Sequence, residues 1–187
     1  MPKRNILILG GARSGKSRHA QELACSISEN TLFVATAEAL DAEMTARISK
    51  HREERPASWR TLEVSTGVVA GLQRHLNGIE VVLLDCVTLL VSNVLLGQGR
   101  GLSESLDVYT PDAGDPVRQE IESLIGVMRV SKASFIVVSN ELGLGLVPEN
   151  QLARIYRDLL GQANQMLAEA ADEVYLMVAG IPLRIKG

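Results

Sequence analysis

The sequence has 187 residues, of which 46% are hydrophobic, 22% are charged and 3% are aromatic, and its formal net charge at pH 7 is −3. An acidic chain with so few rings lacks the basic stripe and stacking platforms of a nucleic-acid surface, so we expect a small-molecule substrate and no nucleic-acid partner. The length suits one domain over residues 1–187, and the lack of a long apolar run predicts a cytoplasmic protein without membrane insertion. Cys25 and Cys86 are too far apart for a Cys-x-x-Cys site, and we expect both to be reduced core residues.

A glycine-rich segment near the start of the chain follows the apolar run Ile6–Leu9. It reads Gly10-Gly11-Ala12-Arg13-Ser14-Gly15-Lys16-Ser17 and matches the P-loop pattern of Gly, four residues, Gly-Lys-Ser. Its glycines let the backbone turn sharply, so that N–H groups surround phosphate oxygens at a helix N-terminus. The pattern predicts that Lys16 reaches the β- and γ-phosphates and that Ser17 ligates Mg²⁺. A glycine-rich turn with a bystander lysine is the alternative.

Continuous apolar runs alternate with segments of helical periodicity along the rest of the chain. This alternation predicts an α/β fold of the P-loop NTPase-like type, with three layers: a mostly parallel central sheet and helices on both faces. Ligands collect at the carboxyl ends of the strands in such sheets. We expect strands at 6–9, 32–35, 59–64, 81–85, 134–139, 173–179 and 181–185, and helices from the P-loop to 27 and over 42–54, 67–75, 88–96, 116–128 and 149–170.

Thr36-Ala37-Glu38 directly follows the second predicted strand, which puts it on the same rim as the P-loop. The helix after it is expected to begin at Asp41 as N-cap and to stop before Pro56. His51 ends an apolar stripe of this helix, where it would pack or cap. It also lies in the run Lys50-His51-Arg52-Glu53-Glu54-Arg55, whose cations suit a polyphosphate.

The segment 59–64 alternates in character, as a half-exposed strand does, and places Arg60 on one face with Thr61 and Glu63 on the other. The next predicted strand ends in Asp85. A buried strand ending in a carboxylate is the Walker B pattern, which supplies a second ligand for Mg²⁺ beside a P-loop. The alternative is that Asp85 caps the following helix.

Two long connections follow. Residues 97–115 are rich in Gly, Ser and Asp and predict a mobile loop. Residues 140–148 form a second glycine-bearing loop on the P-loop rim, for which we expect substrate contacts, with a tight connection as the alternative. In the last long helix, Arg154 and Asp158 are spaced as an i, i+4 ion pair.

Several of these motifs occur together: Gly10–Ser17, His51–Arg55 with Pro56 behind it, 59–63, and Asn140–Asn150. In this combination the sequence resembles the bifunctional adenosylcobinamide kinase and adenosylcobinamide-phosphate guanylyltransferase family of cobalamin biosynthesis. The resemblance runs from Ile6 to about Gly180 and is weakest over residues 97–116.

The resemblance implies two reactions. The aminopropanol hydroxyl of adenosylcobinamide is phosphorylated from ATP or GTP, and GMP from GTP is then transferred to that phosphate, giving adenosyl-GDP-cobinamide. It also implies Mg²⁺, a guanylylated histidine at the position of His51, a catalytic Lys16, and a homo-oligomer, a trimer in the family. The positions matching the guanine nucleotide site are Thr36, Ala37, Glu38, Arg52, Glu53, Glu54, Arg55, Glu63 and Asp85.

Two other functions are compatible with a P-loop. One is a different small-molecule kinase without a covalent nucleotide, in which His51 would be replaceable. The other is a GTP-dependent regulatory switch, although the sequence lacks an Asn-Lys-x-Asp motif. The sequence leaves open whether both activities are retained, which nucleotide the kinase step prefers, how the corrinoid docks, and whether Glu141 or Asp85 is the general base of the kinase step.

Overall fold

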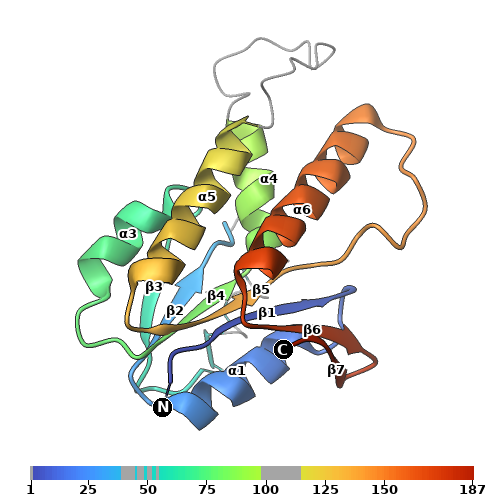
Figure 1. Cartoon of the computed structure of the whole chain (residues 1–187). Helices are drawn as coiled ribbons and strands as arrows, with labels where there is room; N and C mark the ends of the chain where they lie inside the picture. The colour runs from blue at the N-terminus through green and yellow to red at the C-terminus, as the bar shows by residue number, and fades with distance from the viewer. Residues whose placement is uncertain (1, 39–44, 46–48, 50–51, 54, 98–114) are drawn as a thin grey trace.

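A single sheet organises the part of the chain that the computed structural model describes, namely residues 2–38, 45, 49, 52–53, 55–97 and 115–187. Its seven strands have the order β3-β2-β4-β5-β1-β6-β7 (Figure 1). Neighbouring strands are parallel except β6 and β7, which pair antiparallel. The strands are β1 (Asn5–Gly10), β2 (Thr31–Ala35), β3 (Arg60–Glu63), β4 (Val81–Asp85), β5 (Ser134–Val138), β6 (Glu173–Val178) and β7 (Ile181–Lys186).

The described helices cover both faces of this sheet. In Figure 1, α1 lies on one face and the other four lie on the opposite face. This confirms the predicted α/β fold with a mostly parallel sheet. The helices are α1 (Lys16–Ile27), α3 (Val68–His75), α4 (Val87–Gly97), α5 (Asp115–Val130) and α6 (Gln151–Ala170).

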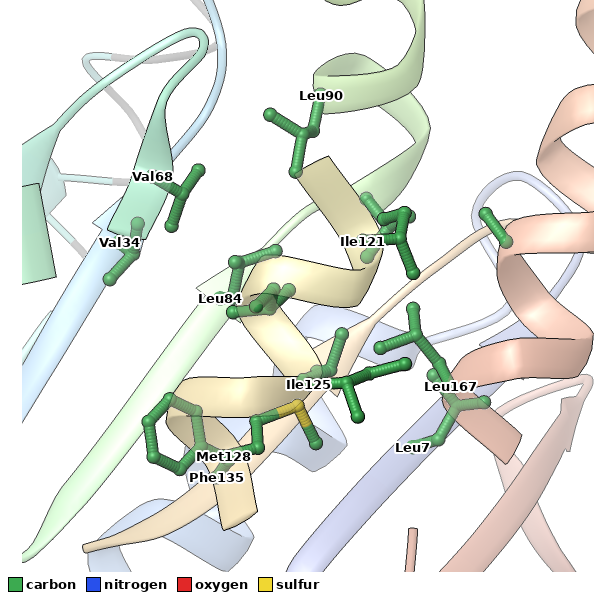
Figure 2. Packing of buried hydrophobic residues seen from close by; sticks show 14 of the residues in the cluster. Leu7, Val34, Val68, Leu84, Leu90, Ile121, Ile125, Met128, Phe135 and Leu167 are labelled. Carbon is green, nitrogen blue, oxygen red and sulfur yellow. The ribbon is translucent and has the colours of Figure 1, made fainter. Parts of the chain in front are cut away.

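The core is divided in two by the sheet, because successive strand residues point to opposite faces. Leu7 of β1 and Phe135 of β5 belong to the larger cluster, which includes Leu167 of α6 (Figure 2). Ile8 belongs to the smaller cluster, which includes Ala24 of α1. Alternate residues of one strand therefore hold helices on both sides of the sheet.

The element boundaries agree closely with the sequence-based ones. Gly97 ends α4 and Asp115 begins α5, so the two end residues of the predicted loop are helical, while residues 98–114 lie outside the described part. Of the helix predicted over 42–54, residues 45, 49, 52 and 53 are helical, and the others lie outside the described residues. Pro116 occupies the first turn of α5, as predicted.

One expectation about the core is wrong. Cys25 is exposed, because the buried side of α1 is formed by Lys16, Ala20 and Ala24, which recur every four residues. Cys86 is partly buried, and neither cysteine is in a disulfide. Within the described residues, no helix has both the length and the apolar character needed to cross a membrane.

Candidate functional site

The P-loop joins β1 to α1 at the carboxyl edge of the sheet. Gly10 and Gly15 have φ angles of 151° and 95°, which favour glycine. A Cβ atom at Gly10 would also lie 2.7 Å from the Met177 carbonyl oxygen, so no larger residue fits without a shift. The Lys16 Nζ donates a hydrogen bond of 2.6 Å to the Gly11 carbonyl oxygen. These constraints give a compact loop with its lysine folded against it, which is the shape of a phosphate cradle.

Two other segments are fixed to this loop through its carbonyl groups. The Glu141 N–H donates to the Gly10 oxygen at 3.1 Å, and the Gly180 N–H donates to the Ser14 oxygen at 3.0 Å. The connection after β5 and the turn between β6 and β7 therefore flank the P-loop (Figure 1). Gly180 was not among the predicted site residues, because nothing in a lone glycine between two short strands points to the P-loop.

Thr36 joins the ends of β2 and β4. Its hydroxyl donates to the Cys86 carbonyl oxygen at 2.7 Å and accepts from the Cys86 N–H at 2.9 Å. The Asn93 side chain donates to the Thr36 carbonyl oxygen at 2.8 Å. Thr36 is fully buried, so its hydroxyl already has partners within the protein. The nucleotide contact predicted for Thr36 stays a prediction, and the structure gives this residue a positioning role beside Asp85.

The charges of Asp85 and Lys16 both affect the thiol of Cys86. Burial raises the pKa of the Cys86 thiol to about 11; the negative charge of Asp85 also raises it, and the positive charge of Lys16 opposes this. Asp85 is at the last position of β4, half-buried, and one strand, β5, separates β4 from the P-loop strand. A carboxylate and an ammonium group therefore both lie close enough to the Cys86 thiol to affect its pKa.

Arg55 lies over the face of Phe33, with its guanidinium carbon 3.7 Å from the ring centroid. The pKa of Arg55 is lowered, chiefly by burial; the negative charges of Asp85 and Glu63 act in the opposite direction and only partly offset this. Its Nε and Nη1 atoms are buried and have no hydrogen-bond partner among the described residues. An arginine with unused donors near the rim is suited to bind an anion.

A pocket of about 570 Å³ lies beside Arg55. Trp59 forms part of its wall and stacks on Phe33, with ring centroids 6.4 Å apart. Thr61 and Glu63 line the same pocket, whereas the Arg60 guanidinium binds the Asn77 carbonyl oxygen at 2.9 Å. This agrees with the predicted division of the strand into two faces.

The Arg52 guanidinium binds the Glu63 carboxylate, through Nε at 3.0 Å and also through Nη2. Both side chains are about half exposed, so this ion pair contributes little to stability. It ties the segment that follows His51 to the end of β3. His51 and Glu54 themselves lie outside the described residues, while Glu53 is exposed.

Ala37 and Glu38 are half-buried and continue the chain from Thr36 along the rim. The structure thus places the P-loop, residues 36–38, Asp85 and Arg55 at one edge of the sheet. Trp59 and Phe33 were not singled out as site residues. Their signal was weak, because an aromatic residue in or beside a predicted strand is most often a core residue.

Taken together, the strand order, the glycine-restricted loop between β1 and α1, and the charged groups at the carboxyl rim define a P-loop nucleotide-binding protein of the α/β class. A solved structure of a protein from Pyrococcus horikoshii OT3 has a TM-score of 0.55 to this chain at 8% identity, over 98% of this chain and 86% of that one. This likeness concerns the fold alone.

Comparison of sequences is more specific. A family model described as cobinamide kinase / cobinamide phosphate guanyltransferase matches residues 6–185. The chain is 45% identical over 182 residues to the "Bifunctional adenosylcobalamin biosynthesis protein CobU" of Escherichia coli K12, covering 97% of this chain and 99% of the relative. It is 41% identical to the "Bifunctional adenosylcobalamin biosynthesis protein CobP" of Pseudomonas aeruginosa, covering 97% of this chain and 96% of the relative. The chain belongs to the cobinamide kinase / cobinamide phosphate guanyltransferase family, as the resemblance predicted.

Proposed function

We propose that this chain phosphorylates the aminopropanol hydroxyl of adenosylcobinamide from ATP or GTP and then transfers GMP from GTP to the resulting phosphate. The transfer passes through His51 carrying GMP, and the product is adenosyl-GDP-cobinamide. Membership in the family supports the two activities. The single structural observation that carries the proposal is the P-loop, in which Lys16 and the backbone of residues 10–17 form a phosphate cradle beside Asp85.

The kinase step requires chiefly positioning and neutralisation of charge. The P-loop N–H groups and Lys16 would hold the β- and γ-phosphates. The acceptor hydroxyl then attacks the γ-phosphorus, the bond from that phosphorus to the bridging oxygen breaks, and the hydroxyl proton leaves to a base. Glu141 and Asp85 are the candidates for that base, since both lie at the rim.

The residues at the rim fit a Mg²⁺ ion. Asp85 is a half-buried carboxylate near Lys16, and Ser17 is the P-loop hydroxyl. No group of three or more His, Cys, Asp or Glu side chains suited to a metal occurs among the described residues, and Mg²⁺ commonly takes one or two protein ligands with phosphate oxygens and water. Ser17 and Asp85 would hold the ion, which would neutralise phosphate charge.

In the transfer step, a ring nitrogen of neutral His51 attacks the α-phosphorus of GTP. The nitrogen–phosphorus bond forms as pyrophosphate leaves, and the phosphate oxygen of the acceptor later displaces the histidine. Support comes from the residues that follow His51 in the chain. Arg52 is bonded to Glu63 at the end of β3, and Arg55 offers unused donors near Asp85. Positive charge on Arg52 and Arg55 near the rim supports the proposal, because it would attract a triphosphate.

The test is to incubate the purified protein with Mg²⁺ and GTP labelled at the α-phosphate, and separately at the γ-phosphate. We expect protein-bound label from the α position only, labile to acid and stable to base, because a phosphoramidate has these properties. The His51→Ala variant should lose the label and GMP transfer while keeping measurable kinase activity.

His75 offers a matched control. It ends α3, and its Nδ1 lies 2.8 Å from the Gly71 carbonyl oxygen, within a helix that leads away from the rim. The His75→Ala variant should label as the parent protein does. Absence of covalent label in a protein that binds GTP would instead favour a small-molecule kinase without a covalent nucleotide.

By resemblance to the family, the proposal extends to a homo-oligomer, a trimer, of single-domain chains acting in the cytoplasm. Light scattering on the purified protein measures the number of chains directly. A monomeric mass at working concentrations would contradict the oligomer.

A further inference from the structure

The loop after β5 exposes large apolar side chains next to the P-loop. Leu144 is 86% exposed, Leu146 is 97% exposed and Val147 is 65% exposed. Single exposed apolar residues are common and need no explanation, but several together at the edge of a site mark a contact surface. Because these side chains lie beside the phosphate cradle, we expect a ligand with apolar surface to cover them.

Hydrogen bonds hold this loop at both ends. Its start is bonded to the P-loop by the Glu141 N–H, and the Glu141 carboxylate accepts from the Gly143 N–H at 2.7 Å. At its end, Arg154 Nη1 donates to the carbonyl oxygens of Pro148 at 3.0 Å and of Glu149 at 2.5 Å. The loop is therefore braced, and the exposure of its apolar residues is a property of a defined backbone.

The loop also turns within itself. The Gly145 N–H donates to the Leu142 carbonyl oxygen at 3.2 Å, and Leu142 packs against the larger core cluster. One leucine of the repeated Gly-Leu pattern thus anchors the loop inward, while Leu144 and Leu146 stay in solvent. Folding alone gives no reason for the two outward leucines.

The opposite side of the P-loop has the same character. Val178 and Ile181 are 56% and 69% exposed and face each other across the β6–β7 pair. The turn between them is bonded to Ser14 of the P-loop through the Gly180 N–H. We call Leu144, Leu146, Val147, Val178 and Ile181 the apolar collar, and Figure 1 shows its two segments on either side of the turn after β1.

We propose that the apolar collar is the surface on which the corrinoid acceptor rests, and that it selects acceptors carrying a macrocycle. This inference rests on the proposed function. A nucleotide fills the cradle with polar phosphates, so the body of a large acceptor must lie on the surface around the loop while its hydroxyl reaches the γ-phosphate. A corrin ring carries methyl groups and hydrocarbon edges, which gain free energy when they cover exposed leucine and isoleucine side chains. The collar is continuous with the phosphate site through the two backbone hydrogen bonds to Gly10 and Ser14.

The test compares the Leu146→Ser and Leu144→Ser variants with Val130→Ser. Val130 ends α5 and is 83% exposed, so it is a matched apolar surface residue outside the collar. Each collar variant should raise the KM for cobinamide about fivefold or more while leaving the KM for ATP unchanged. Val130→Ser should change neither constant.

A truncated acceptor sharpens the test. N-acetyl-1-amino-2-propanol carries the reacting hydroxyl without the macrocycle, so its slow phosphorylation should be equal in the parent protein and in the collar variants. An equal loss with both acceptors would overturn the inference, because it would mean that the loop acts on the phosphate site. An unchanged KM for cobinamide would also overturn it.

Light scattering tests whether a second copy of the chain, in place of the corrinoid, covers the collar. A collar variant that loses activity together with its oligomeric mass would assign these residues to contacts between copies of the chain, against the inference. Wild-type protein that binds ATP but does not phosphorylate cobinamide would instead overturn the proposed function, an outcome visible before any variant is made.

Discussion

The Arg55 guanidinium rests on the Phe33 ring, 3.7 Å from its centroid, and so a positive charge is held in a partly buried place next to the carboxyl rim. Stacking on a ring stabilises a cation without using its hydrogen-bond donors. The buried Nε and Nη1 atoms have no partner among the described residues. Leaving such donors unused costs free energy, which an anion bound there would recover.

Replacing this cation gives the first prediction. In the Arg55→Gln variant, the affinity for GTP should fall about tenfold or more, since a hydrogen bond to a charged group contributes about 1.5–3 kcal/mol. Calorimetric titration with GTP measures the change. Arg60→Gln serves as control, because the Arg60 side chain is bonded to the Asn77 carbonyl oxygen on the other face of β3. Equal affinities of the two variants would contradict the role of Arg55.

Lys16 provides the second prediction, which concerns both reactions. Replacing Lys16 with Ala should lower the kinase rate and the GMP-transfer rate together by about a hundredfold or more, because each uses phosphates held in the same cradle. Radiolabel transfer to cobinamide and to cobinamide phosphate measures the two rates. The Lys132→Ala variant removes an exposed lysine two residues before β5 and should keep both activities. Loss of only one activity in Lys16→Ala would show that the reactions use separate phosphate sites.

The third prediction is about stability. The Thr36 hydroxyl is buried and makes two hydrogen bonds to Cys86, so Thr36→Val should lower the free energy of unfolding by about 1–3 kcal/mol. Urea denaturation measures it. Thr36→Ser keeps the hydroxyl and should lose much less stability. If both variants unfold at the same denaturant concentration, the hydrogen bonds of the Thr36 hydroxyl do not contribute to the free energy of unfolding.

The strands and their mostly parallel arrangement could be predicted, because each central strand is a continuous apolar run and the P-loop motif fixes where β1 ends, whereas the strand order is known only from the structure. The charged contacts could not be predicted. Arg154 and Asp158 have the spacing of an ion pair, yet Arg154 binds the carbonyl oxygens of residues 148 and 149, and Asp158 pairs with Arg157 at 3.8 Å. A long side chain at a helix start has nearby loop carbonyls to choose from, and spacing along the helix does not reveal them.

The candidate site was predictable to a similar extent. The motif identified residues 10–17, and the apolar run 81–84 predicted that Asp85 ends a buried strand. The wall formed by Phe33 and Trp59 depends on packing between β2 and the segment before β3, which no local pattern encodes. Thr36 was correctly placed on the rim by topology, but only the structure reveals that its hydroxyl faces Cys86.

The fourth prediction concerns acid stability at the opposite edge of the sheet. The Tyr175 hydroxyl donates to the Glu173 carboxylate at 2.6 Å. This hydrogen bond is the main cause of a lowered pKa of Glu173; burial opposes it, and the positive charge of Arg4 adds to it. The Arg4 guanidinium also lies 3.2 Å from the same carboxylate. A carboxylate with a lowered pKa stabilises the folded state above its unfolded pKa of about 4.3, and that stability is lost as the pH falls through the folded value.

The Glu173→Gln variant should therefore be less stable than the parent protein at pH 7, by about 1–3 kcal/mol, and the difference should shrink as the pH falls below about 4. Urea denaturation at several pH values measures this. Glu169→Gln, which changes an exposed carboxylate of α6, should follow the parent curve. Tyr175→Phe removes the hydroxyl but keeps the ring that meets His19 edge-on at 5.6 Å, so it should reproduce part of the Glu173→Gln effect. A Glu173→Gln curve parallel to the parent curve down to pH 3 would show that the hydrogen bond does not favour the ionised carboxylate.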